Sequence, residues 1–213
     1  MKSRSVAKSA LLSRRRNSAA QLLDAASCIL AERNAIEITL SDVAAAAKLN
    51  AALVKYHFAN KEGLLLALAR RDIGQALAQL KSLIEMPLAP EQKLRIHVFG
   101  IVNTYAKYPY LNRLLHELLR SKNEVVVREL NAAFIKPLAA AQEALLRQGV
   151  EAGVFREIVP MYFYLAVIGA CDQFFCGGKS LNDALGIPET ALGMREAYAE
   201  FVAEMAIKAL RKE

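Results

Sequence analysis

The chain has 213 residues, of which 54% are hydrophobic and 23% are charged. This composition excludes an intrinsically disordered protein. Its three cysteines are too few for a disulfide framework, which favours a reducing compartment. The longest apolar run, residues 161–171, is too short to cross a bilayer, and no apolar stretch follows the charged N-terminus, so we expect a cytoplasmic protein with no membrane partner.

The net charge of +7 is concentrated at the N-terminus. Residues 1–16 hold no acidic residue and six basic ones: Lys2, Arg4, Lys8, Arg14, Arg15 and Arg16. Such an arm suits a polyanion, either nucleic acid or an anionic membrane surface, or it is a solvated tail with no partner. A membrane role has little support because the arm lacks an apolar face. We expect a basic, flexible arm.

The next segment predicts three helices in close succession. Apolar residues on one stripe predict a helix over 17–33. Thr39 or Ser41 can cap a helix about two turns long that runs through Val43 to Ala47, and Asn50 can cap a second over 51–57. Two short helices joined by a tight turn and preceded by a longer helix form a helix-turn-helix layout. Three helices of an ordinary bundle are the alternative.

Longer helices are predicted for the rest of the chain. Asn60 caps a helix over 61–85, which ends at Met86-Pro87, and Pro90 and Pro109 open helices over 90–107 and 109–121. A helix over 123–148 contains Pro137, which predicts a kink. A turn at Gly149 and Gly153, a helix over 159–176, a loop over 179–188 and a last helix from Glu189 or Thr190 to 210 follow. No stretch alternates with a period of two, so the predicted fold is all-α, with an arm (1–16), a helix-turn-helix domain (17–63) and a larger helical domain (64–213).

Two segments carry a family resemblance. Residues 38–44 read ITLSDVA, and residues 54–64 read VKYHFANKEGL at the expected distance from them. These segments, within residues 18–66, resemble the TetR/AcrR family of bacterial transcriptional regulators. The resemblance implies a repressor that binds a palindromic operator in double-stranded DNA as a homodimer, with the helix around 51–57 in the major groove. It also implies an effector, an unidentified small molecule, in the C-terminal domain, and dimerisation through the helices at 159–176 and 190–210.

The resemblance also implies roles for individual residues. Phosphate contacts fall on Thr39, Lys55, Tyr56, His57 and Lys61. Base edges are read from the positions of Ser41, Ala51, Ala52 and Leu53, while Leu49, Val54 and Phe58 pack the two short helices together.

Departures from the family pattern shape the hypothesis on specificity. Many relatives have glycine in the turn where this chain has Lys48, which predicts either a strained lysine or a turn of different shape. Alanine and leucine at 51–53 offer only contacts to thymine methyl groups. Specificity is therefore hypothesised to depend on Ser41, Lys48, Lys55 and the arm, where Arg14, Arg15 and Arg16 reach an adjacent minor groove. The same apolar helix motivates an alternative, a helical ligand-binding protein with weakened or lost specific DNA binding.

No catalytic or metal-ligating pattern is present in the sequence. The three histidines have no metal-ligand spacing, and no glycine-rich phosphate loop or nucleophile elbow is found, so we expect no enzyme activity, no metal and no cofactor. Cys171 and Cys176 are interpreted as structural thiols, with a redox sensor as the alternative. Asp172 either contributes to a ligand pocket or pairs across the dimer interface. The candidate effector-binding residues are Arg95, His97, Asn103, Tyr105, His116, Arg120, Tyr162, Asp172 and Gln173, a mixture that suggests an uncharged or weakly anionic aromatic or acyl compound.

Overall fold

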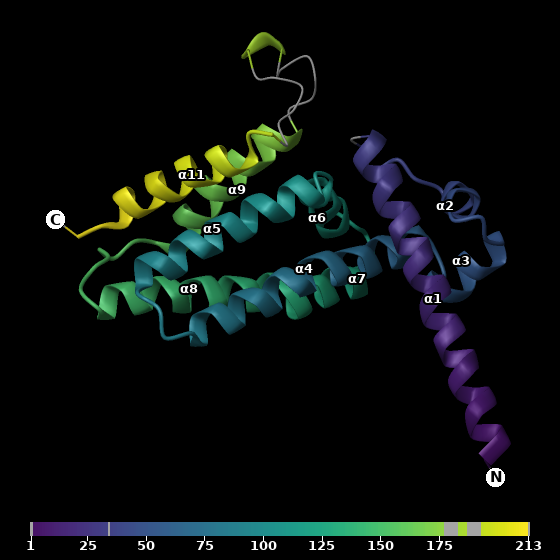
Figure 1. The fold of residues 1–213 in the computed structure, drawn as a ribbon. Helices are drawn as coiled ribbons and strands as arrows, with labels where there is room; N and C mark the ends of the chain where they lie inside the picture. The colour runs from purple at the N-terminus through teal and green to yellow at the C-terminus, as the bar shows by residue number, and fades with distance from the viewer. Residues whose placement is uncertain (1, 34, 177–182, 187–192, 213) are drawn as a thin grey trace.

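The computed structural model describes residues 2–33, 35–176, 183–186 and 193–212, without the side chains of residues 2–16 and of Cys176 (Figure 1). Within these ranges the regular elements are helices, and one isolated backbone bridge joins Phe155 to Arg211. The predicted all-α class is confirmed. No helix in the described ranges is long and apolar enough to cross a membrane. The predicted loop over 179–188 and the predicted start of the last helix lie mostly outside the described residues.

The first three helices are α1 (Lys2–Arg33), α2 (Leu40–Ala46) and α3 (Ala51–Phe58). Thr39 caps α2 in a reciprocal arrangement. Its Oγ1 accepts from the Asp42 amide at 3.1 Å, and the Asp42 carboxylate accepts from the Thr39 amide at 3.2 Å. Asn50 caps α3 by accepting from the Ala52 amide at 2.8 Å. The backbone of α1 runs through the basic arm, so this helix is longer than the predicted 17–33; the flexibility of the arm stays a prediction.

Lys48 lies in the turn between α2 and α3 with a φ of +54°. The amide of Leu49 bonds back to the carbonyl of Ala44 at 2.9 Å, and that of Lys48 to Ala45 at 3.1 Å. This bonding pattern ends many helices and places a residue in the left-handed region, usually glycine. Lysine carries a Cβ that disfavours this backbone. Of the two predicted outcomes, the structure therefore has the strained lysine.

The remaining helices form the larger, C-terminal part of the molecule. Their bounds are α4 (Lys61–Glu85), α5 (Pro90–Lys107), α6 (Leu111–Leu119), α7 (Glu124–Leu130), α8 (Lys136–Glu151), α9 (Pro160–Cys176) and α11 (Arg195–Leu210). The predicted bounds of α4 and α5 agree with these. The prediction that Pro109 opens α6 is wrong, because Leu111 donates back to the Tyr108 carbonyl at 3.0 Å and Pro109 lies inside that turn.

The chain between α7 and α8 is a π-helical turn, η1 (Asn131–Ile135). It ends two residues before Pro137, which lies in the first turn of α8. Proline has no amide hydrogen, and its ring clashes with the carbonyl four residues earlier. A wider turn just before it avoids that clash. The predicted helix over 123–148 is thus interrupted as expected, although the irregular turn lies ahead of the proline.

Two hydrophobic cores divide the described residues. The first contains α1, α2, α3 and the first half of α4, closed by residues of α6 and α7 and by Phe134 of η1. The second contains the end of α4 with α5, α8, α9 and α11. Helix α4 is thus shared, with Leu64 and Leu68 in the first core and Leu77 and Leu80 in the second. A single stiff helix therefore runs from the helix-turn-helix into the larger helical bundle (Figure 1).

Candidate nucleic-acid interface and ligand cavity

Helices α2 and α3 form a helix-turn-helix with an exposed outer face. Val43 and Val54 are buried, and Leu49 and Phe58 are partly buried against the same core. This matches the packing roles assigned to residues 49, 54 and 58. Ala51 and Ala52 in the first turn of α3 are exposed, and Tyr56 is 58% exposed. The helix-turn-helix therefore exposes the N-terminal end of α3, which Asn50 caps, to the solvent.

The structure gathers the predicted DNA-contacting residues 39–61 around this helix. Thr39, Ser41, Lys48, Ala51, Ala52, Lys55 and Tyr56 are exposed, and Leu53, His57 and Lys61 are half-buried. His57 is positioned by α1, because its Nε2 lies 2.9 Å from Ser18 Oγ. The predicted contacts of Arg14, Arg15 and Arg16 lie outside the described side chains.

The first turn of α2 is tied to the end of α1 by charge. Arg33 donates to Asp42 at 3.1 Å. The Thr39 backbone amide lowers the pKa of the Asp42 carboxyl, and the Arg33 side chain lowers it further. The carboxylate form of Asp42 is therefore favoured, which keeps the reciprocal cap of α2 in place.

A cavity of about 630 Å³ lies in the C-terminal helices. Its walls come from α4, α5, α6, α8 and α9, with residue 135 of η1, and are mostly Leu, Ile and Ala. This volume is in the range of sites for small organic molecules. Of the nine predicted effector-binding residues, His97 and Tyr105 line it.

The other seven predicted residues lie elsewhere. Arg95 pairs with Glu200, Asn103 lies beside a separate hollow near Arg195, and the remaining five are exposed or half-buried at the surface: His116, Arg120, Tyr162, Asp172 and Gln173. Sequence reasoning missed Gln142 and Tyr164 in the cavity wall. A signal for Gln142 was available, because it shares an apolar helix stripe with Leu145 and Leu146.

The buried polar groups of the cavity are uncharged. Burial lowers the pKa of His97 to about 4, so its imidazole is neutral at pH 7. Its Nε2 lies 3.5 Å from the amide nitrogen of Gln142, which comes from α8. The Cys171 thiol, buried near Asp172, has its pKa raised to about 12. That shift disfavours the reactive thiolate and supports the structural interpretation of Cys171, whereas the Cys176 side chain lies outside the described residues.

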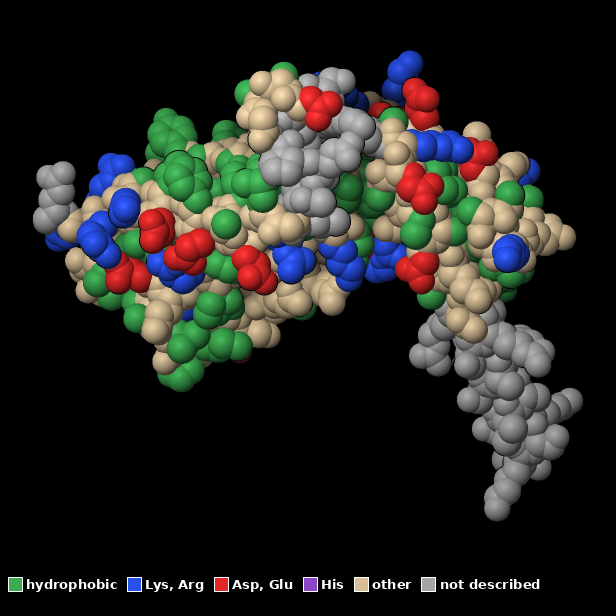
Figure 2. Space-filling view, turned by 45° about the horizontal axis from the view of Figure 1, so that its top comes forward, with side chains coloured by type: hydrophobic (Ala, Val, Ile, Leu, Met, Phe, Trp, Pro, Cys, Tyr) green, Lys and Arg blue, Asp and Glu red, His purple; other side chains and the backbone are tan. Residues whose placement is uncertain are grey.

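Helices α9 and α11 leave an apolar surface uncovered. Tyr162 and Phe201 are 69% and 64% exposed, and Leu165, Met161 and Met205 are also exposed. Figure 2 shows hydrophobic side chains gathered at this end of the molecule, away from the helix-turn-helix. A monomer rarely exposes so many large apolar side chains on neighbouring helices. This surface, the α9–α11 face, is therefore a candidate contact with another chain.

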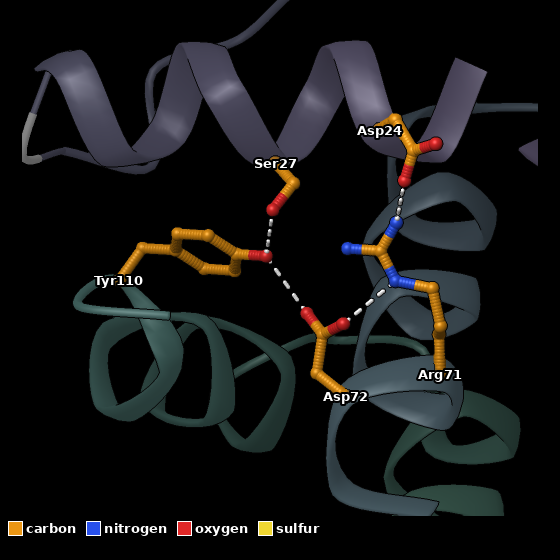
Figure 3. A network of polar contacts seen from close by, with 5 residues as sticks. All are labelled: Asp24, Ser27, Arg71, Asp72 and Tyr110. Carbon is orange, nitrogen blue, oxygen red and sulfur yellow. Dashed lines mark hydrogen bonds and ion pairs between the residues drawn. The ribbon is translucent and has the colours of Figure 1, made fainter. Parts of the chain in front are cut away.

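A buried polar network joins α1 to α4 and to the start of α6 (Figure 3). The Tyr110 hydroxyl donates to Asp72 at 2.7 Å and lies 2.7 Å from Ser27 Oγ on α1. Arg71 donates to Asp72 at 2.7 Å and to Asp24 on α1 at 2.8 Å. Asp72 is only 1% exposed, so its charge depends on these partners.

The direction of the bonds in this network follows from the pKa of Tyr110. Burial raises that pKa, and the nearby Asp72 charge raises it further. The phenol therefore keeps its proton and donates a hydrogen bond to the Asp72 carboxylate. Ser27 then donates to the phenol oxygen. Nearer to α3, Glu62 accepts from Ser121 and from Asn123. Among the described residues, the predicted helix-turn-helix domain (17–63) is thus bonded to the larger bundle through α1 and through the start of α4.

Comparison with known proteins identifies this arrangement. The model of the tetracyclin repressor-like C-terminal domain matches residues 87–211, more than half of the chain, and that of the tetR family of bacterial regulatory proteins matches residues 22–68. The chain belongs to the TetR family of transcriptional regulators. Regulators of this family bind DNA, dimerise and bind small molecules.

Individual relatives of this TetR-family regulator are distant. The HTH-type transcriptional repressor NicS of Pseudomonas putida is 24% identical over 180 residues, covering 81% of this chain and 82% of that protein. A tetR-family regulatory protein from Rhodococcus RHA1 has the same fold, with a TM-score of 0.72, 19% identity and coverage of 92% and 98%. FadR from Bacillus subtilis, solved with stearoyl-CoA, has a TM-score of 0.63, 20% identity and coverage of 86% and 96%.

Proposed function

We propose that this TetR-family regulator is a repressor that binds a palindromic operator as a homodimer and leaves it when a small molecule fills the cavity. The observation that carries the proposal is the position of the cavity next to the buried network. Ile73 and Leu111 line the cavity, and they directly follow Asp72 and Tyr110 in the chain. A ligand between α4 and α6 therefore pushes on the residues that bond to α1.

The helix-turn-helix supplies the DNA-binding end. The exposed first turn of α3 fits the major groove, while Lys55 and Tyr56 on the following turn are exposed for phosphate contacts. Because Ala51 and Ala52 have no hydrogen-bonding side chains, base readout on this helix consists of methyl contacts. Ser41, Lys48 and the arginines of the arm supply the remaining specificity in this proposal.

The α9–α11 face supplies the dimer contact. Its exposed Tyr162, Leu165 and Phe201 would be buried between two copies. Asp172 also lies on α9, but its Oδ1 atom is buried inside the single chain without a hydrogen-bond partner among the described residues, so this atom does not serve as a contact across the interface. A two-fold dimer presents two copies of α3 to two half-sites of one operator.

Release follows from coupling between the two ends. In this proposal the dimer has two conformations that differ in the spacing of the two α3 helices, and only one of them fits the operator. A ligand that binds more tightly to the other conformation lowers DNA affinity by the ratio of its affinities for the two conformations. The same coupling requires operator DNA to weaken ligand binding by an equal factor.

Selection of bound fragments from the source organism's genomic DNA, followed by footprinting and a salt titration, tests the proposal. We expect a two-fold symmetric protected site, with half-sites one helical turn or a multiple apart, and affinity that falls steeply with salt. Leu165→Glu should give a monomer in sedimentation that loses the footprint, whereas Ala139→Glu on the exposed side of α8 should change neither. Lack of enrichment would contradict the proposal.

The second candidate function is ligand binding without specific DNA recognition. The apolar exposed face at the first turn of α3 is the observation that favours it. In that case the purified protein would bind all duplexes with equal affinity, and ligand binding would be independent of DNA.

A further inference from the structure

We infer that the cavity takes an uncharged, largely apolar molecule, held at one point by a hydrogen-bonding group that meets His97 and Gln142. As a statement about the effector, this inference rests on the proposed function. As a statement about what the cavity binds, it stands independently.

The first argument is the composition of the wall. Among the described residues that line the cavity there is no Asp, Glu, Lys or Arg. The arginine nearest to His97 in the sequence, Arg95, is paired with Glu200. A carboxylate, phosphate or ammonium group brought into this space would lose its water without gaining a counter-ion. The wall therefore selects against charged molecules.

The second argument is the polar pair inside this apolar wall. His97 and Gln142 are each less than one tenth exposed, and within the described part of the chain they have only each other as hydrogen-bond partners. The 3.5 Å between their nitrogens makes a weak bond. An amide has two donor hydrogens and an acceptor oxygen, so Gln142 keeps unused bonding capacity toward the cavity. A hydroxyl, carbonyl or amine of a ligand would satisfy it.

The third argument is the space itself. Gly100 lines the cavity on α5, and a Cβ added at this position would meet no atom within 4 Å. A larger side chain can therefore enter the cavity from this point of the wall. The same position gives a way to block the cavity without disturbing the helix backbone.

Two fluorescent probes with one scaffold test the inference. N-phenyl-1-naphthylamine is uncharged at neutral pH, and 8-anilino-1-naphthalenesulfonate adds a sulfonate to the same ring system. Titrated into the full chain, the neutral probe should bind one site per chain with at least tenfold higher affinity than the sulfonate. Gln142→Leu should lower the affinity for the neutral probe severalfold, because the hydrogen bond between the Gln142 side-chain amide and the amine of the probe is lost.

Variants assign the signal to the cavity. Gly100→Phe should abolish high-affinity binding of the neutral probe, whereas Ala139→Phe, on the exposed side of α8, should leave it unchanged. Gln79 lines the cavity from an exposed position, so Gln79→Lys should raise the affinity for the sulfonate and not for the neutral probe. Equal binding of both probes, or binding of the neutral probe that survives Gly100→Phe, would overturn the inference.

Failure of the proposed function would look different. If the neutral probe binds as described but operator affinity is unchanged by it and by Gly100→Phe, the ligand class stands and the effector role is wrong. If operator binding is intact and the cavity prefers the sulfonate, the proposed function stands and the ligand class is wrong.

Discussion

The helix-turn-helix and the C-terminal bundle hold their polar groups in different ways. In the helix-turn-helix the capping bonds are local: Thr39 with Asp42, and Asn50 with Ala52, are two or three residues apart. In the bundle and at its joint with α1, the bonds span long distances in the chain, such as 83 residues between Ser27 and Tyr110 and 45 between His97 and Gln142. The first kind is set by neighbours in the sequence, and the second depends on how the helices pack.

The largest expected effect is at the joint between the two regions. Asp72→Ala removes the buried carboxylate, which leaves the Tyr110 hydroxyl without its acceptor and Arg71 with only the exposed Asp24, so we expect a loss of about 4 kcal/mol in the free energy of unfolding. Asp24→Ala is the matched control, because Asp24 bonds the same arginine from an exposed position; it should cost less than about 1 kcal/mol. Denaturant unfolding of both variants measures the difference, and equal costs would show that the joint is not a buried network.

The next largest effect is the pH dependence of stability that His97 in the C-terminal bundle produces. Burial depresses the pKa of His97 to about 4 from its ordinary 6.5, so the unfolded chain binds the proton more readily. The stability that depends on neutral His97 is complete above pH 6.5 and is lost as the pH falls toward 4, up to about 3 kcal/mol.

Because carboxyl groups titrate in the same range, the measurement is the difference between the pH profile of the wild type and that of His97→Gln. That difference should change between pH 6.5 and 4 and be flat above. A constant difference would mean that His97 is not buried in the neutral form.

A smaller effect concerns the helix-turn-helix alone. Lys48→Gly removes the Cβ at a left-handed φ and should stabilise the chain by about 1 kcal/mol in thermal or denaturant unfolding. Lys55→Gly, at a right-handed position inside α3, should destabilise it by about 1 kcal/mol. The same sign at both positions would contradict the strained turn.

The smallest effect is on DNA binding. Lys55→Ala should lower the slope of log affinity against log salt by about 1, with similar losses on all duplexes, because it removes one phosphate contact. Lys136→Ala, exposed on α8 in the other region, should leave the slope unchanged. An unchanged slope in Lys55→Ala would remove this residue from the interface.

The contrast between local and long-range bonds explains which features of the fold and of the candidate site could be predicted from the sequence. The cap at Asn50 and the break at Met86-Pro87 predicted α3 and α4 closely, because these signals act within one turn of helix, and of the two caps predicted for α2 the structure has Thr39. The effector-binding list matched the cavity in two of its residues, because a polar side chain on a helix faces a cavity, a neighbouring helix or water according to packing. Arg95 illustrates this: it turns to Glu200 on α11, more than a hundred residues away.

By itself the sequence determined the all-α class and the capping of α3 and α4 by Asn50 and Asn60, since each depends on residues a few positions apart, whereas at Lys48 it left two outcomes open. Only the tertiary structure decided that Asp72, Tyr110 and Ser27 meet, that α4 is shared between two cores, and that His97 and Gln142 form a neutral polar pair in an apolar cavity. The physical reason is that burial and long-range hydrogen bonds are properties of packed helices, which no single helix contains.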